Sequence, residues 1–198
     1  MAYDKFKILN SSAVPLKIDN VDTDQIIPAR FLKATERIGF GDNLFRDWRY
    51  KSDGSPIETF PLNNKKYKGN ILVAGKNFGC GSSREHAVWA IYDNGFRAVV
   101  SSFFADIFKN NCLNIGVLPV QVSDSFLTEI FSQIEKNSDS IFEINLENQE
   151  FIIKETGKKE KFNISVYKKS NMSNGFDDID YLLNKKKEIS KFANKSRY

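Results

Sequence analysis

Apolar and polar positions follow two different patterns along the chain, and the first of these lies between residues 71 and 120. There the short apolar segments ILVAG, RAVVSSFF and GVLPV are separated by REHAVWAIYDNGF and ADIFKNNCLN, which have helical spacing. Apolar strands that alternate with helices are typical of parallel βαβ units buried on both faces. This region is therefore predicted to form a parallel βαβ core.

From residue 140 onward the apolar positions recur at every second residue. The segments SIFEINL, EFIIKE and KFNISVY alternate in this way, with the turn sequences ENQ and TGKK between them. Such alternation predicts an antiparallel meander with one buried face. KFKIL near the N-terminus alternates similarly and predicts a half-buried strand. Together these patterns indicate a mixed α/β fold in a single domain over residues 1–198.

Two further segments lie outside the predicted parallel core and meander. FDDIDYLLNKKKEISKF places Phe176, Ile179, Leu182 and Leu183 on one stripe of a predicted helix, acidic at its start and basic at its end. In contrast, residues 34–70 show weak periodicity. A patternless stretch of that length is usually functional or mobile. A mobile loop is therefore predicted over residues 30–70.

The composition is that of an ordinary globular protein, with 41% hydrophobic and 27% charged residues among 198. No apolar run approaches the roughly 20 residues of a membrane span, and no apolar secretion signal is evident at the N-terminus. Cys80 and Cys112 match no disulfide or zinc spacing, and an iron–sulfur cluster normally takes four cysteines. We expect a cytoplasmic protein with no metal site in this chain.

The net charge of +4 raises the question of a nucleic-acid partner. The basic residues concentrate in TGKKEKF and NKKKEISKFANKSRY, at a turn and at the C-terminal end. Clusters placed in this way are typical of solvated faces. We therefore expect neither a nucleic-acid nor a membrane partner.

The glycine-rich stretch GCGSSREHA begins at Gly79 and holds the only histidine of the chain, His86. Ser82 and Glu85 form the S-x-x-E pattern of a capping box, which needs no function. Arg84 stands where a dinucleotide-binding turn has its third glycine, and the stretch contains neither G-K-[ST] nor G-x-S-x-G. Dinucleotide, P-loop and nucleophile-elbow sites are therefore disfavoured.

An anion site remains compatible with this stretch. A strand that ends in glycines before a helix presents free backbone N–H groups, and Ser82, Ser83 and Arg84 add side-chain donors. A guanidinium binds a carboxylate through two hydrogen bonds, and the same positive surroundings would favour a serine alkoxide. Ser82 is thus a candidate base as well as a candidate helix cap.

At this point the residues resemble a known family. NFGCGSSREHAVWAI, NVDTDQIIPARFLK, FADIFKNNCLNIGVLPV, RIGFGDNLFRDWRY and DDIDYLL are similar to segments of 3-isopropylmalate dehydratase small subunits, in the aconitase superfamily, and together they span essentially the whole chain. The resemblance implies an aconitase-like swivelling β/β/α domain. It also implies the interconversion of 2-isopropylmalate and 3-isopropylmalate in leucine biosynthesis, by removal and re-addition of water.

The resemblance assigns roles to individual residues. Ser82 matches the catalytic base, while Ser83, Arg84, Asp24 and Thr23 match substrate-binding positions. The stretch after IIP faces the variable end of the substrate in relatives, and here it holds Arg30, Phe31, Leu32 and Lys33. The apolar pair Phe31 and Leu32 suits an isopropyl group.

The resemblance also implies a large partner subunit that carries an iron–sulfur cluster, with a small dicarboxylate as substrate. Two alternatives stay open, namely a related hydro-lyase acting on citraconate or homoaconitate, and a non-catalytic carboxylate-binding module. His86, four residues after Ser82, is interpreted as a structural or supporting residue. Cys80 is interpreted as a small packed residue whose position near a helix could lower its thiol pKa.

Overall fold

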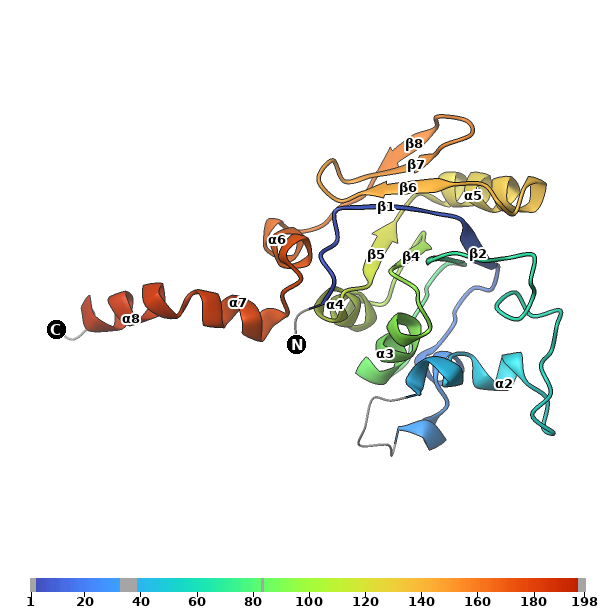
Figure 1. Cartoon of the computed structure of the whole chain (residues 1–198), viewed down its shortest axis with the longest axis horizontal. Coiled ribbons are helices and arrows are strands. Elements are labelled where there is room, and N and C mark those ends of the chain that lie inside the picture. Colours follow the sequence, from blue (N-terminus) through green and yellow to red (C-terminus); the bar gives the residue numbers. More distant parts are fainter. Residues whose placement is uncertain (1–2, 33–38, 83, 196–198) are drawn as a thin grey trace.

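The computed structural model describes residues 3–32, 39–82 and 84–195, and a parallel sheet lies at its centre (Figure 1). Its strands, in spatial order, are β2 (Ala13–Leu16), β3 (Ile71–Ala74), β4 (Ala98–Ser101) and β5 (Leu118–Gln121). All neighbouring pairs are parallel, with α3 (Glu85–Asp93) between β3 and β4 and α4 (Asp106–Ile115) between β4 and β5. The predicted βαβ core is confirmed, and β2 is a strand that the sequence analysis missed.

The second sheet is antiparallel and has the order β1-β6-β7-β8. Its strands are β1 (Ile8–Ser11), β6 (Phe142–Asn145), β7 (Glu150–Ile153) and β8 (Lys159–Lys161). The meander is confirmed, but the prediction that KFNISVY is a strand is wrong beyond Lys161. Ser165 accepts a hydrogen bond from the Lys168 N–H and begins α6 (Val166–Asn174), so capping turns the chain into a helix there.

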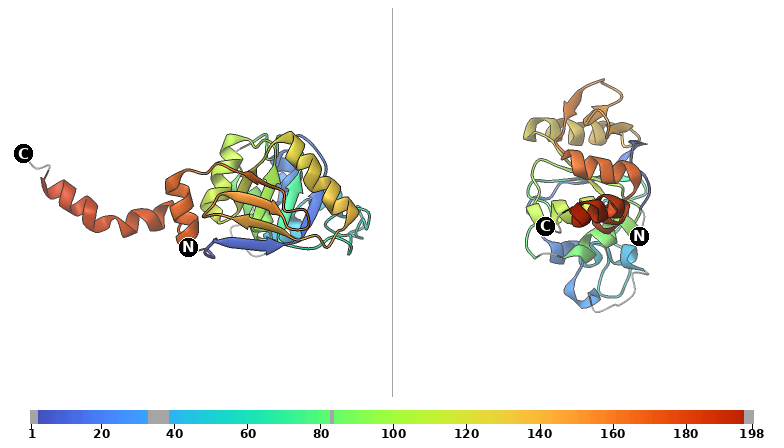
Figure 2. Two further views of the ribbon diagram at one scale, coloured as in Figure 1. Left: turned by 90° about the horizontal axis from the view of Figure 1, so that it is seen from above. Right: turned by 90° about the vertical axis from the view of Figure 1, so that its left-hand side faces the viewer.

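Successive residues of the parallel strands face two separate hydrophobic clusters. Ile71, Val73 and Val100 join the antiparallel sheet in one cluster, whereas Leu72 and Val99 pack with α3 and α4 in the other. Because side chains of a strand alternate between faces, apolar residues at every position place the sheet between two layers. The result is a β/β/α arrangement, seen from two further directions in Figure 2.

Helix α5 (Asp124–Lys136) was not predicted from the sequence. Ser123 caps it by accepting a hydrogen bond from the Phe126 N–H. Its buried face packs beside the antiparallel sheet and consists of Phe126, Leu127, Ile130, Phe131 and Ile134. The serine cap followed by apolar residues at helical spacing is the signal that would have found it.

The aromatic segment after residue 38 contains η2 (Phe40–Asn43) and α2 (Arg46–Arg49). Phe40, Leu44 and Phe45 are buried in the cluster formed with α3 and α4. A Cβ on Gly41 would lie 2.6 Å from the Asp93 carbonyl carbon, so only glycine lets η2 approach the end of α3 this closely.

The predicted C-terminal helix is confirmed as α7 (Asp178–Asn184) and α8 (Lys186–Lys195), but Phe176 precedes the cap Asp177 and lies outside the helix that was predicted to include it. Both project away from the body of the molecule (Figures 1 and 2), and Ile179, Leu182 and Leu183 are exposed. Within the described ranges, no helix has the length and apolar character needed to cross a membrane.

Candidate active site

The loops that follow β2 and β3 lie side by side at the carboxyl ends of these adjacent parallel strands. The Gly79 N–H donates to the Val21 carbonyl at 2.8 Å, and the Thr23 N–H donates to the Cys80 carbonyl at 3.0 Å. Carboxyl ends of parallel strands are where open α/β sheets bind ligands. These bonds bring α1 (Thr23–Ile26) against the glycine-rich turn, and with it Asp24.

The glycine-rich turn passes directly over an aromatic ring of α4. Gly79 has φ +76°, and a Cβ at this position would lie 2.1 Å from Cγ of Phe108. Only glycine combines the left-handed backbone with this approach. Phe108 is buried and therefore supports the turn from below.

Ser82 does not cap α3, so the predicted capping box is wrong. The helix begins at Glu85 with Arg84 as its N-terminal flanking residue, and the Arg84 N–H donates to the Ser82 carbonyl at 2.9 Å. This tight turn keeps Ser82 outside the helix. Its side chain is exposed, and its hydroxyl forms no hydrogen bond with the other residues that the structure describes. Ser83 lies outside the described residues.

Thr23 holds the turn in position from the neighbouring loop. Its side chain is 1% exposed, and its hydroxyl donates to the Ser82 carbonyl at 3.0 Å. Because the donor is buried, the bond is sheltered from competition with water. Thr23 therefore determines where the Ser82 side chain emerges.

Arg84 and Asp24 form an ion pair beside Ser82. A guanidinium nitrogen of Arg84 donates to a carboxylate oxygen of Asp24, and the two side chains are 20% and 54% exposed. The structure thus brings together four of the residues predicted for the site, namely Ser82, Thr23, Asp24 and Arg84. Asp24 occupies the guanidinium as a carboxylate ligand would, so the pair marks a place where a carboxylate can bind.

His86 and Cys80 are the other two side chains of this region that could take part in chemistry. The ring of His86 packs against the rings of Trp89 and Phe40, with centre-to-centre distances of 4.6 and 5.6 Å. Because α3 begins at Glu85, Ser82 is outside the helix, and His86 does not share a helical face with it. Partial burial and then the charge of Asp22 raise the pKa of the Cys80 thiol. The suggestion that its position lowers this pKa is therefore wrong.

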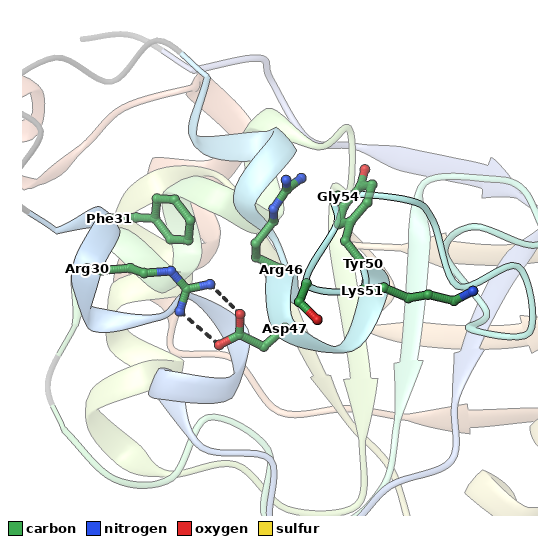
Figure 3. Close-up of a pocket in the computed structure, with 8 residues that line it drawn as sticks. Arg30, Phe31, Arg46, Asp47, Tyr50, Lys51 and Gly54 are labelled. Atoms are coloured by element: carbon green, nitrogen blue, oxygen red, sulfur yellow. Dashed lines mark hydrogen bonds and ion pairs between the residues drawn. The ribbon is translucent and has the colours of Figure 1, made fainter.

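The segment after Pro28 forms η1 (Ala29–Phe31), whose Arg30 pairs with Asp47 of α2 through two hydrogen bonds (Figure 3). The guanidinium of Arg30 also lies 4.7 Å from the centre of the Phe31 ring. The hydrogen bond from Arg30 lowers the pKa of Asp47, which keeps its carboxylate charged. Asp47 was not singled out from the sequence, although it lies in the aromatic segment RIGFGDNLFRDWRY.

Phe31 and Leu32 are partly buried and pack on the cluster shared with α3. A pocket of about 490 Å³ adjoins this segment, and its lining does not include Ser82 or Arg84. The residues that line it come from η1, α2 and the turn that follows, namely Arg30, Phe31, Arg46, Asp47, Tyr50, Lys51, Ser52 and Gly54 (Figure 3). Lys33 lies outside the described residues.

Comparison with known proteins identifies the family. Residues 3–125 match the model of the aconitase C-terminal domain. The 3-isopropylmalate dehydratase small subunit of Christiangramia forsetii is 59% identical over 98% of this chain and 95% of its own. The chain belongs to the family of 3-isopropylmalate dehydratase small subunits. That of Cytophaga hutchinsonii is 58% identical over 98% of this chain and 97% of its own.

The fold comparison agrees with this family. The crystal structure of 3-isopropylmalate dehydratase LeuD from Methanocaldococcus jannaschii is 32% identical, with a TM-score of 0.67 over 93% of this chain and 98% of that chain. The predicted aconitase-like fold is confirmed. The match with the Christiangramia protein spans 194 of the 198 residues and therefore includes the C-terminal helices α7 and α8.

The described residues do not fit an iron–sulfur cluster. Among them, no group of three or more His, Cys, Asp or Glu side chains could hold a metal ion. Cys112 is fully buried in α4, and burial raises the pKa of its thiol well above the usual value. Thiolates are the ligands of such clusters, so neither cysteine is prepared for that role.

Proposed function

We propose that this chain is the small subunit of a cytoplasmic 3-isopropylmalate dehydratase that isomerises 2-isopropylmalate and 3-isopropylmalate in leucine biosynthesis. The observation that carries the proposal is an exposed, unbonded Ser82 hydroxyl next to the Arg84–Asp24 pair, in a chain of this family. A large subunit completes the enzyme. In this proposal the large subunit holds the iron–sulfur cluster, which supplies a Lewis acid for the departing hydroxyl.

Arg84 is proposed to bind a substrate carboxylate. An incoming carboxylate takes the place of Asp24 on the guanidinium, and an exchange of one carboxylate for another preserves the charge balance. Asp24 is the more exposed partner of the pair. After the exchange its carboxylate no longer pairs with Arg84, and it remains nearby as a negative charge. Ser83 is proposed to add a second hydroxyl donor for the same group.

Ser82 is proposed to transfer the proton. As an alkoxide, its oxygen takes a proton from the carbon next to the one that carries the hydroxyl, and the C–H electron pair forms the double bond as hydroxide leaves. In rehydration the Ser82 hydroxyl returns that proton to the other carbon, hydroxide adds at the carbon first deprotonated, and the alkoxide forms again. Arg84 and the positive surroundings of the turn favour the alkoxide. The bond from Thr23 holds the Ser82 carbonyl and with it the backbone from which the Ser82 side chain extends.

The experiment that tests this function uses the chain reconstituted with its large subunit and an intact cluster. A positioned base contributes about 10²–10⁴-fold to a rate, so we expect Ser82→Ala to lower kcat by at least about that factor. Affinity for the large subunit should stay unchanged, because the Ser82 hydroxyl holds nothing in place. Isopropylmalate turnover is the measurement, with citraconate and homoaconitate assayed in parallel.

Ser132→Ala provides the control, because Ser132 is exposed on α5 and belongs to the opposite layer. This variant should keep normal turnover. Near-normal turnover by Ser82→Ala would show that Ser82 is not the base, and His86 would be the next candidate to test. Preference of the wild-type enzyme for citraconate or homoaconitate would overturn the substrate, and carboxylate binding without any turnover would indicate a non-catalytic module.

A further inference from the structure

The C-terminal arm, defined as α7 and α8 (Asp178–Lys195), is fixed to the body at its first turn. A carboxylate oxygen of Asp178 accepts hydrogen bonds from Lys168 at 2.6 Å and from the Tyr167 hydroxyl at 2.8 Å. The rings of Tyr167 and Tyr181 pack edge to face, with their centres 4.6 Å apart. These contacts join the first turn of the arm to α6, and Figures 1 and 2 show the direction in which the arm leaves it.

Beyond this root, the arm carries an apolar stripe that packs on neither hydrophobic cluster of the body. Its side chains are between 51% and 74% exposed and are those of Ile179, Leu182, Leu183, Ile189 and Phe192. The Lys185 N–H still donates to the Tyr181 carbonyl, so α7 runs almost without a break into α8. Leu182 and Ile189 are seven residues apart, the spacing of a helix that packs along a partner.

The charges of the arm indicate the kind of partner. Asp178 is bound to Lys168, while Asp177 and Asp180 cap α7, so the acidic groups at the root are already engaged. Lys186, Lys187 and Lys191 are exposed and form no ion pair with a described residue. The free charge is therefore positive, and with a net charge of +4 two copies of the chain would repel each other.

We propose that the arm docks on the large subunit, with its apolar stripe in a groove of that subunit whose edges carry carboxylates. This inference rests on the proposed function, which supplies the large subunit as the partner. The arm reaches about 25 Å beyond the body, so it can contact a region of the partner remote from Ser82. It also lies within the length of chain matched by relatives named as small subunits.

The test is the dissociation constant of the full chain and its large subunit, measured by calorimetry at low and high salt. Phe192→Asp places a charge on the stripe and should weaken binding about tenfold or more. Asn194→Asp is the matched control, two residues away and across α8 from Phe192, and should bind as the wild type does at high salt, where screening removes the effect of its charge on the neighbouring Lys191. Lys191→Glu should weaken binding chiefly at low salt, because screening removes its contribution at high salt.

Three results would overturn the docking. One is an unchanged dissociation constant for Phe192→Asp. Another is a wild-type dimer in analytical ultracentrifugation that Phe192→Asp dissociates, which would assign the stripe to a second copy. The last is binding to phosphatidylserine vesicles that Phe192→Asp abolishes without affecting the large subunit. Failure of the proposed function looks different, namely a tight wild-type complex that does not convert isopropylmalate.

Discussion

At the scale of single residues, the exposed Asp24 carboxylate is the partner that a substrate carboxylate would replace on Arg84. Asp24 is 54% exposed and Arg84 20%, so solvent reaches the pair from the Asp24 side and screens its attraction. A substrate held by further contacts therefore displaces Asp24 at little cost. The proposed chemistry then depends on the Ser82 hydroxyl. This hydroxyl has no hydrogen bond to another described residue that would have to break first.

Cys80 lies two residues before Ser82, and the structure predicts that its thiol is less reactive than a free one. Because burial and Asp22 raise the pKa of its thiol, less thiolate is present near neutral pH than in a free cysteine. We expect iodoacetamide to modify Cys80 more slowly than it modifies glutathione at pH 7, with a rate that rises above the ordinary thiol pKa. Mass spectrometry distinguishes Cys80 from the buried Cys112. Modification faster than that of glutathione would contradict this assignment.

Leu32 tests which residues distinguish substrates. If Phe31 and Leu32 face the isopropyl group, Leu32→Arg should lower kcat/KM for isopropylmalate and favour a substrate with a carboxylate at that end. An apolar pocket discriminates by about 1–3 kcal/mol per methylene, so the loss should be partial. The measurement is kcat/KM for isopropylmalate and homoaconitate on the reconstituted enzyme. An unchanged ratio would show that this segment does not contact the variable end.

At the scale of elements, the site depends on two loops that are joined along their length. Backbone bonds from Gly79 and Thr23 connect the loop after β2 to the turn after β3, and Phe108 of α4 lies beneath that turn. Three elements therefore meet at one short peptide segment. A disturbance there should affect stability and catalysis together.

Gly79→Ala provides the corresponding prediction. Its Cβ would overlap the Phe108 ring at 2.1 Å in a left-handed backbone, so we expect a loss of about 3 kcal/mol or more in the free energy of unfolding, and lower turnover. Gly157→Ala is the matched control, with φ +69° and no atom within 4 Å of the added Cβ. It should lose about 1–2 kcal/mol through backbone strain alone and keep its activity. Urea unfolding of both variants gives the comparison, and equal losses would remove the ring overlap as the cause.

At the scale of the whole molecule, the parallel sheet connects both hydrophobic clusters. Val99 and Val100 are neighbours on β4 but belong to different clusters. Unfolding one layer would expose the strands that support the other. We therefore propose that the chain is one domain that unfolds in one cooperative transition.

Two tryptophans make this testable, because Trp48 and Trp89 both pack on the cluster with α3 and α4. Ile144 is fully buried in the other cluster, and Ile144→Ala should destabilise the protein by about 2–5 kcal/mol. We expect the urea midpoint of tryptophan fluorescence to fall together with that of circular dichroism. A fluorescence midpoint that stays in place while circular dichroism shifts would show that the layers unfold separately.

Local patterns along the chain were enough to predict several elements and chemical groups. Continuous apolar strands between helices predicted the parallel core, because a strand buried on both faces is apolar at every position. Alternation predicted the meander, because a strand buried on one face is apolar at every second position. Helix α5 has such a pattern as well, from the Ser123 cap to Ile134, although it was not predicted. The glycines, serines and Arg84 of one short stretch likewise indicated an anion site.

Tertiary structure decided what depends on contacts between distant parts of the chain. Ser82 and Glu85 fit a capping box, yet the bonds from the loop after β2 hold Ser82 outside the helix and leave its hydroxyl free. The raised pKa of the Cys80 thiol arises from burial beside Asp22, which is remote in sequence. The apolar stripe of the C-terminal segment predicts an amphipathic helix. It does not tell whether that helix packs on the body or projects from it as an arm. In the structure the first turn of α7 contacts Lys168 and Tyr167 of α6, and the stripe beyond that turn is exposed.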